Sequence, residues 1–582
     1  MSTGAARPSR MIDRGLARWV QAHTGSAVLA RAAFAASVAE GEGHACALLA
    51  SSFGDAGLAA LRAQPWVGDG TAFTPFVLDA DARFYFWRNW RHERELAHAL
   101  LGRRDAGTGT TADTLQHDLD ALFGDEQPRA TTRQREAVAR VIDARLLVLT
   151  GGPGTGKTST VVRMLAMLLR HAAIAGLPAH PAIALAAPTG KAAQRLGQAI
   201  AHGKAALLER LDPASPFRAL LDRIPQGEAR TLHRLLGFRP AGNTFVHGRA
   251  NPLAADIVVV DEASMVDLAL MRQLFDALRA DARLVIVGDP GQLASVDAGS
   301  VLADIVAATP PAPEPPLARN IVTLDHVWRA QGSLARGVAA LRGANHGWLD
   351  ALLENGGDDA LGFEACTEPA RLRARIVAWL ERHAGVHARL FDRRAQPAEA
   401  LSALRECQLL CALREGPFGV AGANALVTRW LGERHGFDPL RTWHAGRPVI
   451  VTRNDAARGL FNGDIGIALE GPDGLRVWFE SSDRDGRPAL RSHSPRVLPA
   501  CETAWAITVH RSQGSEYADV AVILPPDPDN PLLTRELVYT AVSRARRQAL
   551  LWAAPDVLRA ALARTTRRDG GLRDRLARGA AG

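Results

Sequence analysis

The sequence has few cysteines and no long apolar run. Its five cysteines are scattered over 582 residues without a C-x-x-C pair, which argues against a disulfide framework and against a cysteine-held zinc or iron–sulfur site. We expect them to be buried thiols. No apolar run is long enough to span a bilayer, and the small, basic start lacks the apolar core of a secretion signal. These absences predict a cytoplasmic protein without a membrane role.

Lysine is also scarce. The chain has 69 basic residues and a formal net charge of +8, yet its only lysines are Lys157, Lys191 and Lys204. A positive balance favours a polyanionic partner without identifying it. Because arginine stands almost everywhere else, we expect a remaining lysine to do what a guanidinium cannot, such as act as a compact charge in a tight phosphate loop.

The length is too great for one hydrophobic core and predicts roughly three or four domains. Residues 1–112 are predicted to form a helical domain, and a Gly- and Thr-rich stretch at 105–114 marks its end. Its aromatic residues interleave with arginines, which suggests base stacking as one interpretation. We favour packing in a core or against a partner surface for these residues, which are Phe84, Phe86, Trp87 and Trp90.

Two α/β units are predicted to follow. Short apolar runs succeeded by helices indicate a parallel sheet within residues 113–325, and ligands of such sheets bind at the carboxyl ends of the strands. A proline-rich connector at 307–319 leads to a second unit over residues 326–582. The alternating segments at 445–500 predict a small β-barrel inserted into that second unit. Strands are expected at 146–150, 183–187, 257–260 and 284–287, and near 407–411, 519–524 and 549–553.

The stretch GGPGTGKT at 151–158 matches G-x-x-x-x-G-K-[ST] between an apolar strand and a helix, the context of a phosphate-binding loop. Backbone N–H groups of such a loop surround phosphates at a helix N-terminus, where the dipole favours negative charge. Lys157 is expected to reach the β- and γ-phosphates of ATP, and Thr158 to hold Mg²⁺. The loop residues predicted to bind ATP are Gly151, Gly152, Pro153, Gly154, Thr155, Gly156, Lys157, Thr158 and Ser159.

Other side chains suited to ATP hydrolysis accompany the expected strands. Asp261, directly after an apolar strand, is placed to bind Mg²⁺, and Glu262 to polarise the attacking water. Gln292, in the turn after the next strand, is placed to sense the γ-phosphate. Upstream, the Gln134 amide can pair with both N6 and N7 of adenine and so select ATP over GTP.

These residues describe a P-loop ATPase, which can be a switch, a transporter engine or a nucleic-acid motor. Arg544 is expected on a helix of the second α/β unit, far in sequence from the phosphate loop. An arginine from that unit can close on the γ-phosphate as a finger, which contributes roughly 10³–10⁵ in rate. Two units that close on ATP and reopen can alternately tighten and loosen on a strand, so we favour a translocase.

Seven motifs together resemble those of superfamily 1 helicases. In order, they are GGPGTGKT, APTGKAAQRL, TLHRLLG, VVVDEASMVD, VGDPGQLASV, TVHRSQGSEY and YTAVSRAR. Their wording is similar to the RecD group, whose members move from 5′ to 3′ along single-stranded DNA. The resemblance covers nearly the whole chain. It implies an α/β fold with two RecA-like P-loop domains, an inserted SH3-like β-barrel and a helical N-terminal domain.

The resemblance also assigns roles to particular residues. It implies Lys157 and Glu262 in catalysis, with Gln292 as γ-phosphate sensor. Arg329 takes the place of a first arginine finger and Arg544 of a second. The implied DNA contacts grip phosphate without reading sequence, and they are Pro188, Thr189, Lys191, His233, Thr508, His510, Ser512 and Gln513.

Two kinds of protein make up the RecD group. One is the alpha subunit of exodeoxyribonuclease V, which works beside RecB and RecC; the other is a stand-alone helicase with a longer N-terminal extension. This chain has a short N-terminal region, so it resembles the first kind, and residues 1 to about 110 would dock onto RecC. The implied process is double-strand break repair by homologous recombination, with degradation of linear duplex DNA. The implied substrates are single-stranded DNA and tailed or blunt duplexes.

The sequence shows no nuclease constellation of clustered Asp, Glu and Lys, so the cutting residues of such a complex are expected in another subunit. Two alternatives stay open. A stand-alone RecD-like helicase would need no large partners. A P-loop ATPase switch that does not translocate would have little use for a second α/β unit, and single-stranded DNA would hardly stimulate its hydrolysis.

Overall fold

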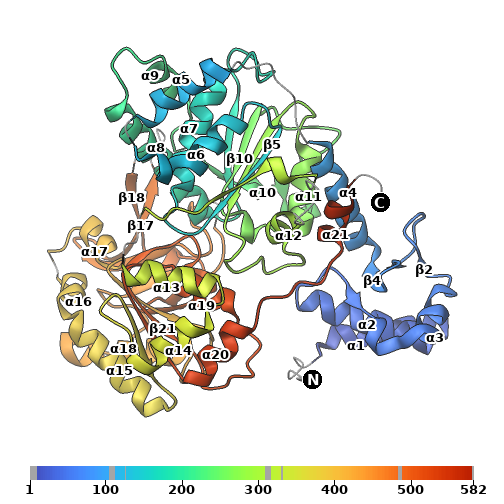
Figure 1. Cartoon of the computed structure of the whole chain (residues 1–582). Helices are drawn as coiled ribbons and strands as arrows, with labels where there is room; N and C mark the ends of the chain where they lie inside the picture. Colours follow the sequence, from blue (N-terminus) through green and yellow to red (C-terminus); the bar gives the residue numbers. More distant parts are fainter. Residues whose placement is uncertain are drawn as a thin grey trace.

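The computed structural model shows two α/β units with an N-terminal region beside the first (Figure 1). In the described part of the chain, no helix combines the length and apolarity that crossing a membrane requires. The described residues are 9–103, 112–124, 126–227, 229–308, 316–328, 332–392, 394–455, 457–482 and 488–579.

The N-terminal region mixes helices with a small sheet. Its helices are α1 (Met11–Thr24), α2 (Ala27–Gly41), α3 (Ala50–Arg62) and α4 (Trp87–Gly102). Its strands, in the order β1-β4-β3-β2, are β1 (Ala47–Leu48), β2 (Val67–Gly68), β3 (Phe76–Leu78) and β4 (Arg83–Phe86). The helices expected for this region are present, but the small sheet was not predicted, because strands of two to four residues are too short to show an alternating pattern.

The aromatic residues of this region pack as expected. Phe84 is fully buried and stacks on Phe76 with ring centroids 5.1 Å apart, and Trp90 is 5% exposed. Phe86 is half-buried against the hydrophobic core that contains Phe84, and Trp87 is half-buried against the core that contains Trp90. Core packing, rather than an open stacking platform, accounts for the burial of these side chains.

The first α/β unit contains a six-stranded parallel sheet in the order β12-β5-β11-β10-β6-β7. The four strands expected from the sequence are present as β5 (Leu146–Gly151), β6 (Ile183–Ala187), β10 (Ile257–Val260) and β11 (Arg283–Gly288). The sequence did not reveal β7 (Arg230–Thr231) or β12 (Ile321–Leu324), which lie at the two edges. A short two-stranded hairpin, β8 (Phe238–Arg239) with β9 (Thr244–Phe245), stands apart from this sheet.

Helices cover both faces of this sheet. Along β5, Leu146 and Val148 join one hydrophobic core, whereas Leu147 and Leu149 join the other. This is the burial expected of a parallel strand that is covered on both sides. The unit's helices are α5 (Ala112–Phe123), α6 (Pro128–Arg140), α7 (Lys157–Arg170), α8 (Gly190–Arg210), α9 (Phe217–Leu221), α10 (Leu232–Leu235), α11 (Leu268–Ala277) and α12 (Val301–Ala307).

The second α/β unit contains a five-stranded parallel sheet in the order β13-β22-β21-β14-β20. The strands are β13 (Leu361–Ala365), β14 (Cys407–Cys411), β20 (Ala506–Thr508), β21 (Tyr517–Ile523) and β22 (Ala545–Ala553). The helices are α13 (Ser333–Arg342), α14 (His346–Asn355), α15 (Pro369–Arg382), α16 (Ala384–Phe391), α17 (Pro397–Ala403), α18 (Val420–His435), α19 (Arg535–Val542) and α20 (Pro555–Ala563).

A five-stranded antiparallel sheet is inserted between β14 and β20 of the second unit, where the sequence predicted a β-rich insertion. Its order is β18-β17-β16-β15-β19, and its small core includes Val449, Val477 and Phe479. We call it the inserted sheet. Its strands are β15 (Pro448–Val451), β16 (Ile465–Gly471), β17 (Gly474–Ser482), β18 (Pro488–His493) and β19 (Cys501–Thr503).

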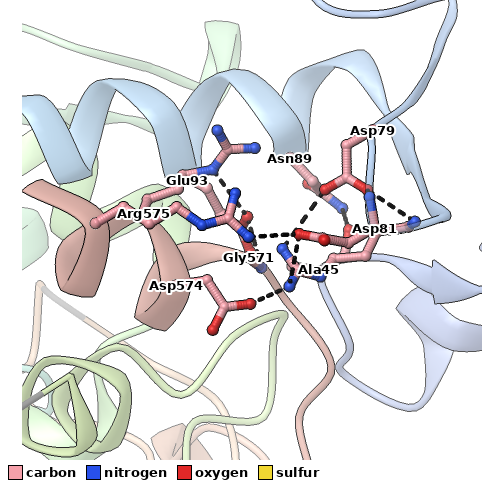
Figure 2. Close-up of polar contacts among 10 residues, drawn as sticks. Ala45, Asp79, Asp81, Asn89, Glu93, Gly571, Asp574 and Arg575 are labelled. Carbon is pink, nitrogen blue, oxygen red and sulfur yellow. Dashed lines mark hydrogen bonds and ion pairs between the residues drawn. The ribbon is translucent and has the colours of Figure 1, made fainter. Parts of the chain in front are cut away.

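After α20 the chain runs back to the first unit, where α21 (Leu572–Arg578) lies between α4 and α12 (Figure 1). Residues 565–579 form this return segment. Both carboxylate oxygens of the buried Glu93 accept from the Gly571 N–H at 2.9 Å, and Arg83 pairs with Asp574 (Figure 2). Leu572 and Leu576 join the core that α4 shares with the first sheet. The two ends of the chain therefore complete one face of that sheet together.

All five cysteines are free. Cys46, Cys366 and Cys411 are buried, as the sequence predicted, whereas Cys407 and Cys501 are half-buried. Burial raises the pKa of the Cys411 thiol to about 12, which keeps it protonated and inert.

Candidate active site between the two α/β units

The phosphate loop, residues 151–158, joins β5 to α7. Gly154 and Gly156 have φ angles of 75° and 85°, in the left-handed region that favours glycine, so the chain can turn sharply before the helix begins. The Lys157 ammonium donates to the carbonyl oxygens of Gly151 and Gly152 at 2.8 and 2.9 Å. Lysine is thus held over the loop as a point charge, and the first N–H groups of α7 face the same space.

Two carboxylates stand at the end of β10, two strands from β5 in the sheet. The Glu262 N–H donates to Asp261 Oδ1 at 2.8 Å, and Glu262 has a left-handed φ of 50°. Burial, followed by the Glu262 charge, raises the pKa of Asp261 to about 6, while the nearby Lys157 ammonium lowers it. A half-buried carboxylate whose charge is only partly compensated is suited to meet a cation.

The donor atoms next to the phosphate loop fit Mg²⁺. Asp261 and Thr158 line one cleft and supply a carboxylate and a hydroxyl oxygen, the hard ligands that Mg²⁺ prefers. Among the described residues, no group of three or more His, Cys, Asp or Glu side chains is arranged to hold a metal by itself.

A second pocket lies on the α6 side of the loop. Its walls include Gln134, Gly156, Ser159 and Trp328. The Gln134 side-chain amide donates to the Thr155 carbonyl oxygen at 3.1 Å, and the backbone N–H of Trp328 donates to the Gly154 carbonyl oxygen at 2.8 Å. Trp328 is 41% exposed, so it offers an open aromatic face. The sequence motifs gave Trp328 no role, because its place beside the phosphate loop depends on a contact between segments that are distant in sequence.

The second unit places Arg544 opposite the loop. Arg544 is 4% exposed and its guanidinium donates to the carbonyl oxygens of Thr540 and Ser515 at 3.1 and 3.3 Å. It lies two residues beyond the end of α19, so the expectation that a helix carries it was wrong. The turn leaves it directly before β22, held by backbone carbonyls. Arg329, expected as the other arginine finger, lies outside the described residues.

The two units enclose a cleft of about 510 Å³. The cleft brings together most of the residues that the sequence assigned to catalysis, from three strand ends of the first unit and one turn of the second. It also contains Arg195 of α8, for which the motifs gave no role. The predicted residues along its wall are Pro153, Gly154, Gly156, Lys157, Thr158, Ser159, Asp261, Glu262, Gln292 and Arg544.

Six of the eight residues predicted to contact DNA are exposed or half-buried, and two of these six, Lys191 and Gln513, are engaged within the protein. Pro188 and Thr189 are half-buried at the end of β6, where the Thr189 hydroxyl caps α8 by accepting from the Ala192 N–H at 3.2 Å. His233 of α10 is exposed and packs edge-on against Phe238, with ring centroids 5.3 Å apart. His510 is half-buried in the turn after β20.

The buried Thr508 and Ser512 and the half-buried Gln513 and Lys191 are engaged within the protein. Ser512 is fully buried and its hydroxyl donates to the Val509 carbonyl oxygen at 2.7 Å. Thr508 is 8% exposed and accepts from the Arg511 N–H, and the Gln513 amide donates to the Leu293 carbonyl oxygen at 3.1 Å. In this structure these three side chains shape the turn instead of facing outward. A pattern of residue types does not show which way each side chain points.

Lys191, the fourth, lies in a separate cavity between α8 and the inserted sheet, lined also by Asp464 and Glu480. Burial lowers the pKa of this lysine to about 7, while the two carboxylates act in the opposite direction. Close by, the Phe461 ring comes so near Gly190 that a Cβ there would lie 2.6 Å from it, and Arg234 stands over the same ring at 5.9 Å. The inserted sheet therefore reaches across to the surface on which DNA contacts were predicted.

Comparison with known proteins agrees with this arrangement. A family model described as an AAA domain matches residues 134–298, and one described as a UvrD-like helicase C-terminal domain matches residues 503–552. The phosphate loop of the first unit and Arg544 of the second line the same cleft. Together with that arrangement, these matches define the class of protein, which is an ATP-dependent helicase.

The curated relatives are more specific. The RecBCD enzyme subunit RecD of Mycobacterium tuberculosis (strain H37Rv) is 41% identical over 531 residues, covering 89% of this chain and 84% of the relative. That of Haemophilus influenzae is 31% identical over 531 residues, covering 84% and 79%. The ATP-dependent RecD2 DNA helicase of Deinococcus radiodurans is 30% identical over 481 residues, covering 82% of this chain and 54% of the relative. The chain belongs to the RecD family.

Proposed function

We propose that this chain is a DNA motor that uses ATP to move from 5′ to 3′ along single-stranded DNA, and that it serves as the RecD subunit of an exodeoxyribonuclease V complex with RecB and RecC. One observation carries the motor assignment: the phosphate loop of the first unit and Arg544 of the second line the same cleft. Closure of that cleft on ATP brings the two units together, and its reopening after hydrolysis separates them.

In the proposed hydrolysis, Lys157 and the N–H groups of the loop hold the β- and γ-phosphates. Thr158 and Asp261 would hold Mg²⁺, which supplies charge neutralisation at the phosphates when bound. Glu262 accepts the proton of the attacking water, Gln292 senses the γ-phosphate, and Arg544 stabilises its charge in the transition state. Arg329 directly follows Trp328 in the sequence, and it stays the proposed first finger.

The base of ATP is proposed to bind in the pocket beside α6. Gln134 is anchored there by the Thr155 carbonyl oxygen, and Trp328 presents its open face to the same space. The indole stacks on adenine and the Gln134 amide reads the adenine edge. Selection of ATP over GTP follows from that edge contact.

DNA is proposed to cross the two units beside the inserted sheet. The proposed contacts are Pro188, Thr189, His233 and His510, each of which is exposed or half-buried. Thr508, Ser512 and Gln513 support the turn that presents His510, and Lys191 meets DNA when the inserted sheet moves away. We infer that this sheet is the SH3-like barrel of the family and that the two α/β units are its RecA-like domains.

The N-terminal region is proposed as the surface that docks RecC. It exposes large apolar side chains that its own cores do not use, among them Met11, Ile12, Trp19 and Phe73. Single-stranded DNA and tailed or blunt duplexes are the proposed substrates of the complex, in double-strand break repair and in degradation of linear duplex DNA. The higher identity and the fuller coverage of the RecBCD subunits favour this assignment over a stand-alone RecD-like helicase.

The test is strand displacement by the purified chain on duplexes that carry a 5′ or a 3′ single-stranded tail, with Lys157→Ala as the matched inactive variant. We expect only the 5′-tailed duplex to open, and we expect the variant to lose hydrolysis while it keeps its fold, because the loop loses its charge and not its backbone. Circular dichroism of both proteins provides the control for folding.

Other outcomes separate the alternatives. Hydrolysis stimulated by single-stranded DNA without unwinding would show that the motor needs RecB and RecC. Hydrolysis that DNA does not stimulate would favour the non-translocating switch. Full ATP turnover by Lys157→Ala would contradict the site assignment itself.

A further inference from the structure

The turn that carries Gln292 is bound by the second unit at several points. We call residues 289–293 the sensor turn. The Tyr539 hydroxyl, on α19, donates to Asp289 Oδ2 at 2.7 Å, and the Leu293 N–H donates to the Thr540 hydroxyl at 3.1 Å. The Gln513 amide also donates to the Leu293 carbonyl oxygen at 3.1 Å. A five-residue turn of one unit thus makes three hydrogen bonds with the other.

Asp289 is the centre of these contacts. Its Oδ2 accepts from the Tyr539 hydroxyl and from the Gln292 amide at 3.2 Å, while its Oδ1 accepts from the Gly291 N–H at 3.0 Å. Asp289 and Tyr539 are each 1% exposed. One buried carboxylate oxygen therefore links a hydroxyl of the second unit to the side chain proposed to sense the γ-phosphate.

The chemistry fixes the direction of each bond. Burial and the Asp289 charge raise the pKa of Tyr539 well above its ordinary value, so its hydroxyl keeps its proton and donates. The Gln292 amide must turn its nitrogen toward Asp289, because two acceptors facing each other would repel. Its carbonyl oxygen is left buried without a partner among the described residues. A side chain in that state is suited to exchange partners when nucleotide enters.

Tyr539 also reaches the phosphate loop. A Cβ on Gly152 would lie 3.2 Å from the Tyr539 hydroxyl, and a Cβ on Gly291 would lie 3.5 Å from its ring. The tyrosine thus stands between the loop and the sensor turn. It is also on the helix that leads to Arg544, so its position follows the movement of that arginine.

We propose that Tyr539 is a positioning residue of the second unit that acts through Asp289 on Gln292, so that the sensor adopts its working position only when the second unit is in place. This proposal rests on the proposed ATPase motor and adds to it a route between the units. When the cleft changes shape, α19 carries the hydroxyl with it, and the shared carboxylate transmits that movement to the Gln292 amide.

The test is a double-mutant cycle on the full chain with Tyr539→Phe, Gln292→Ala and both together, measured as ATP hydrolysis stimulated by single-stranded DNA. Tyr539→Phe removes only the hydroxyl. We expect it to lower kcat about tenfold and to leave the KM for ATP within about twofold, since coupling between sites is typically of this size. The double variant should be no slower than Gln292→Ala, because the tyrosine acts through the glutamine.

Tyr517→Phe is the matched control. Tyr517 is in the same unit and 2% exposed, and its hydroxyl pairs with Ser515 of its own unit and not with the sensor turn. This variant should retain the wild-type kcat, and both Phe variants should have similar thermal unfolding temperatures. That comparison separates positioning from a general loss of stability.

Two results would overturn the proposal: Tyr539→Phe with the wild-type kcat, or a double variant that is slower than Gln292→Ala by the full factor seen for Tyr539→Phe alone. Failure of the proposed function is distinguishable from both. In that case the wild-type chain itself would show no hydrolysis stimulated by DNA, whatever the variants do.

Discussion

At the scale of single residues, Trp328 is central to the pocket that we propose for the base of ATP. Its backbone is fixed by the Gly154 carbonyl oxygen, and its ring is exposed beside Gly156 and Gln134. A ring that is held by its main chain yet open on one face loses little conformational freedom when a flat base stacks on it. The affinity for ATP should therefore depend strongly on this one side chain.

Trp328→Ala is predicted to weaken ATP binding by about 1–3 kcal/mol, the usual worth of an aromatic–base stack. Binding of a fluorescent ATP analogue, followed by titration, measures this loss. Trp328→Phe keeps an aromatic face and should retain most of the affinity. Unchanged affinity in Trp328→Ala would place the base elsewhere.

The three lysines show how far residue types predict a site. Lys157 lies in the phosphate loop as the motif requires, because a compact ammonium fits between two carbonyl oxygens. Lys204 is 1% exposed and donates to the Ile224 carbonyl oxygen at 2.8 Å, which is a structural role in a core. Lys191 faces two carboxylates of the inserted sheet. The scarcity of lysine singled out all three positions. It could not predict their different surroundings, because those depend on contacts between segments distant in sequence.

At the scale of helices and strands, the predictable elements are those whose patterns are long and local. The strands β5, β10 and β11 could be predicted because each is a run of four to six consecutive buried residues that ends at a turn. The edge strand β7 has two residues, neither fully buried, and leaves no pattern to detect. The docking of α21 depends on partners almost five hundred positions earlier, such as Glu93, which no local pattern contains.

Leu576→Ala in α21 is predicted to destabilise the docked return segment by about 2–5 kcal/mol, because Leu576 is 1% exposed in the core shared with α4 and its removal leaves a cavity. Hydrogen exchange of residues 572–578 reports the loss as faster exchange. Leu440→Ala is the matched control, since Leu440 is 91% exposed. Unchanged exchange in Leu576→Ala would contradict the packing described for α21.

At the scale of the whole molecule, the C-terminal part of the described chain returns to the first unit and packs on it. The second unit follows the first in sequence, and the return segment leads from its end back to the first unit and the N-terminal region (Figure 1). Arg568 of that segment donates to the carbonyl oxygens of Glu42 and Ser295, and the latter lies two residues beyond the sensor turn. Two connections between the units, one at each end of the second, restrict how far the cleft opens.

The docking of the return segment on the first unit is predicted to weaken as pH rises. Burial raises the pKa of Glu93 to about 7 from an ordinary value of 4.5, so the folded state favours the protonated acid. The contribution of Glu93 to the free energy of unfolding is therefore fully present below about pH 4.5, and it is lost as pH rises through about 7. Asp304, whose pKa burial raises to about 8, acts in the same direction.

Glu93→Gln isolates this effect, since the amide oxygen still accepts from Gly571 but does not titrate. Urea unfolding of both proteins should give similar midpoints at about pH 5. At about pH 8 the variant should be more stable, by on the order of 3 kcal/mol, as the size of the pKa shift implies. Arg575 lies 3.8 Å from the Glu93 carboxylate, so a wild type that gains stability relative to the variant as pH rises would show that Arg575 compensates the charge fully.

The pairing of Glu93 with Gly571 also implies a delay during synthesis of the chain, because the two residues are made at different times. The two residues are 478 positions apart, so a ribosome adding roughly 5–20 residues per second makes the second on the order of half a minute to a minute and a half after the first. Throughout that interval α4 and one face of the first sheet lack Leu572 and Leu576, and an apolar surface stays open to water. We therefore expect the nascent chain to be prone to aggregation until α21 emerges.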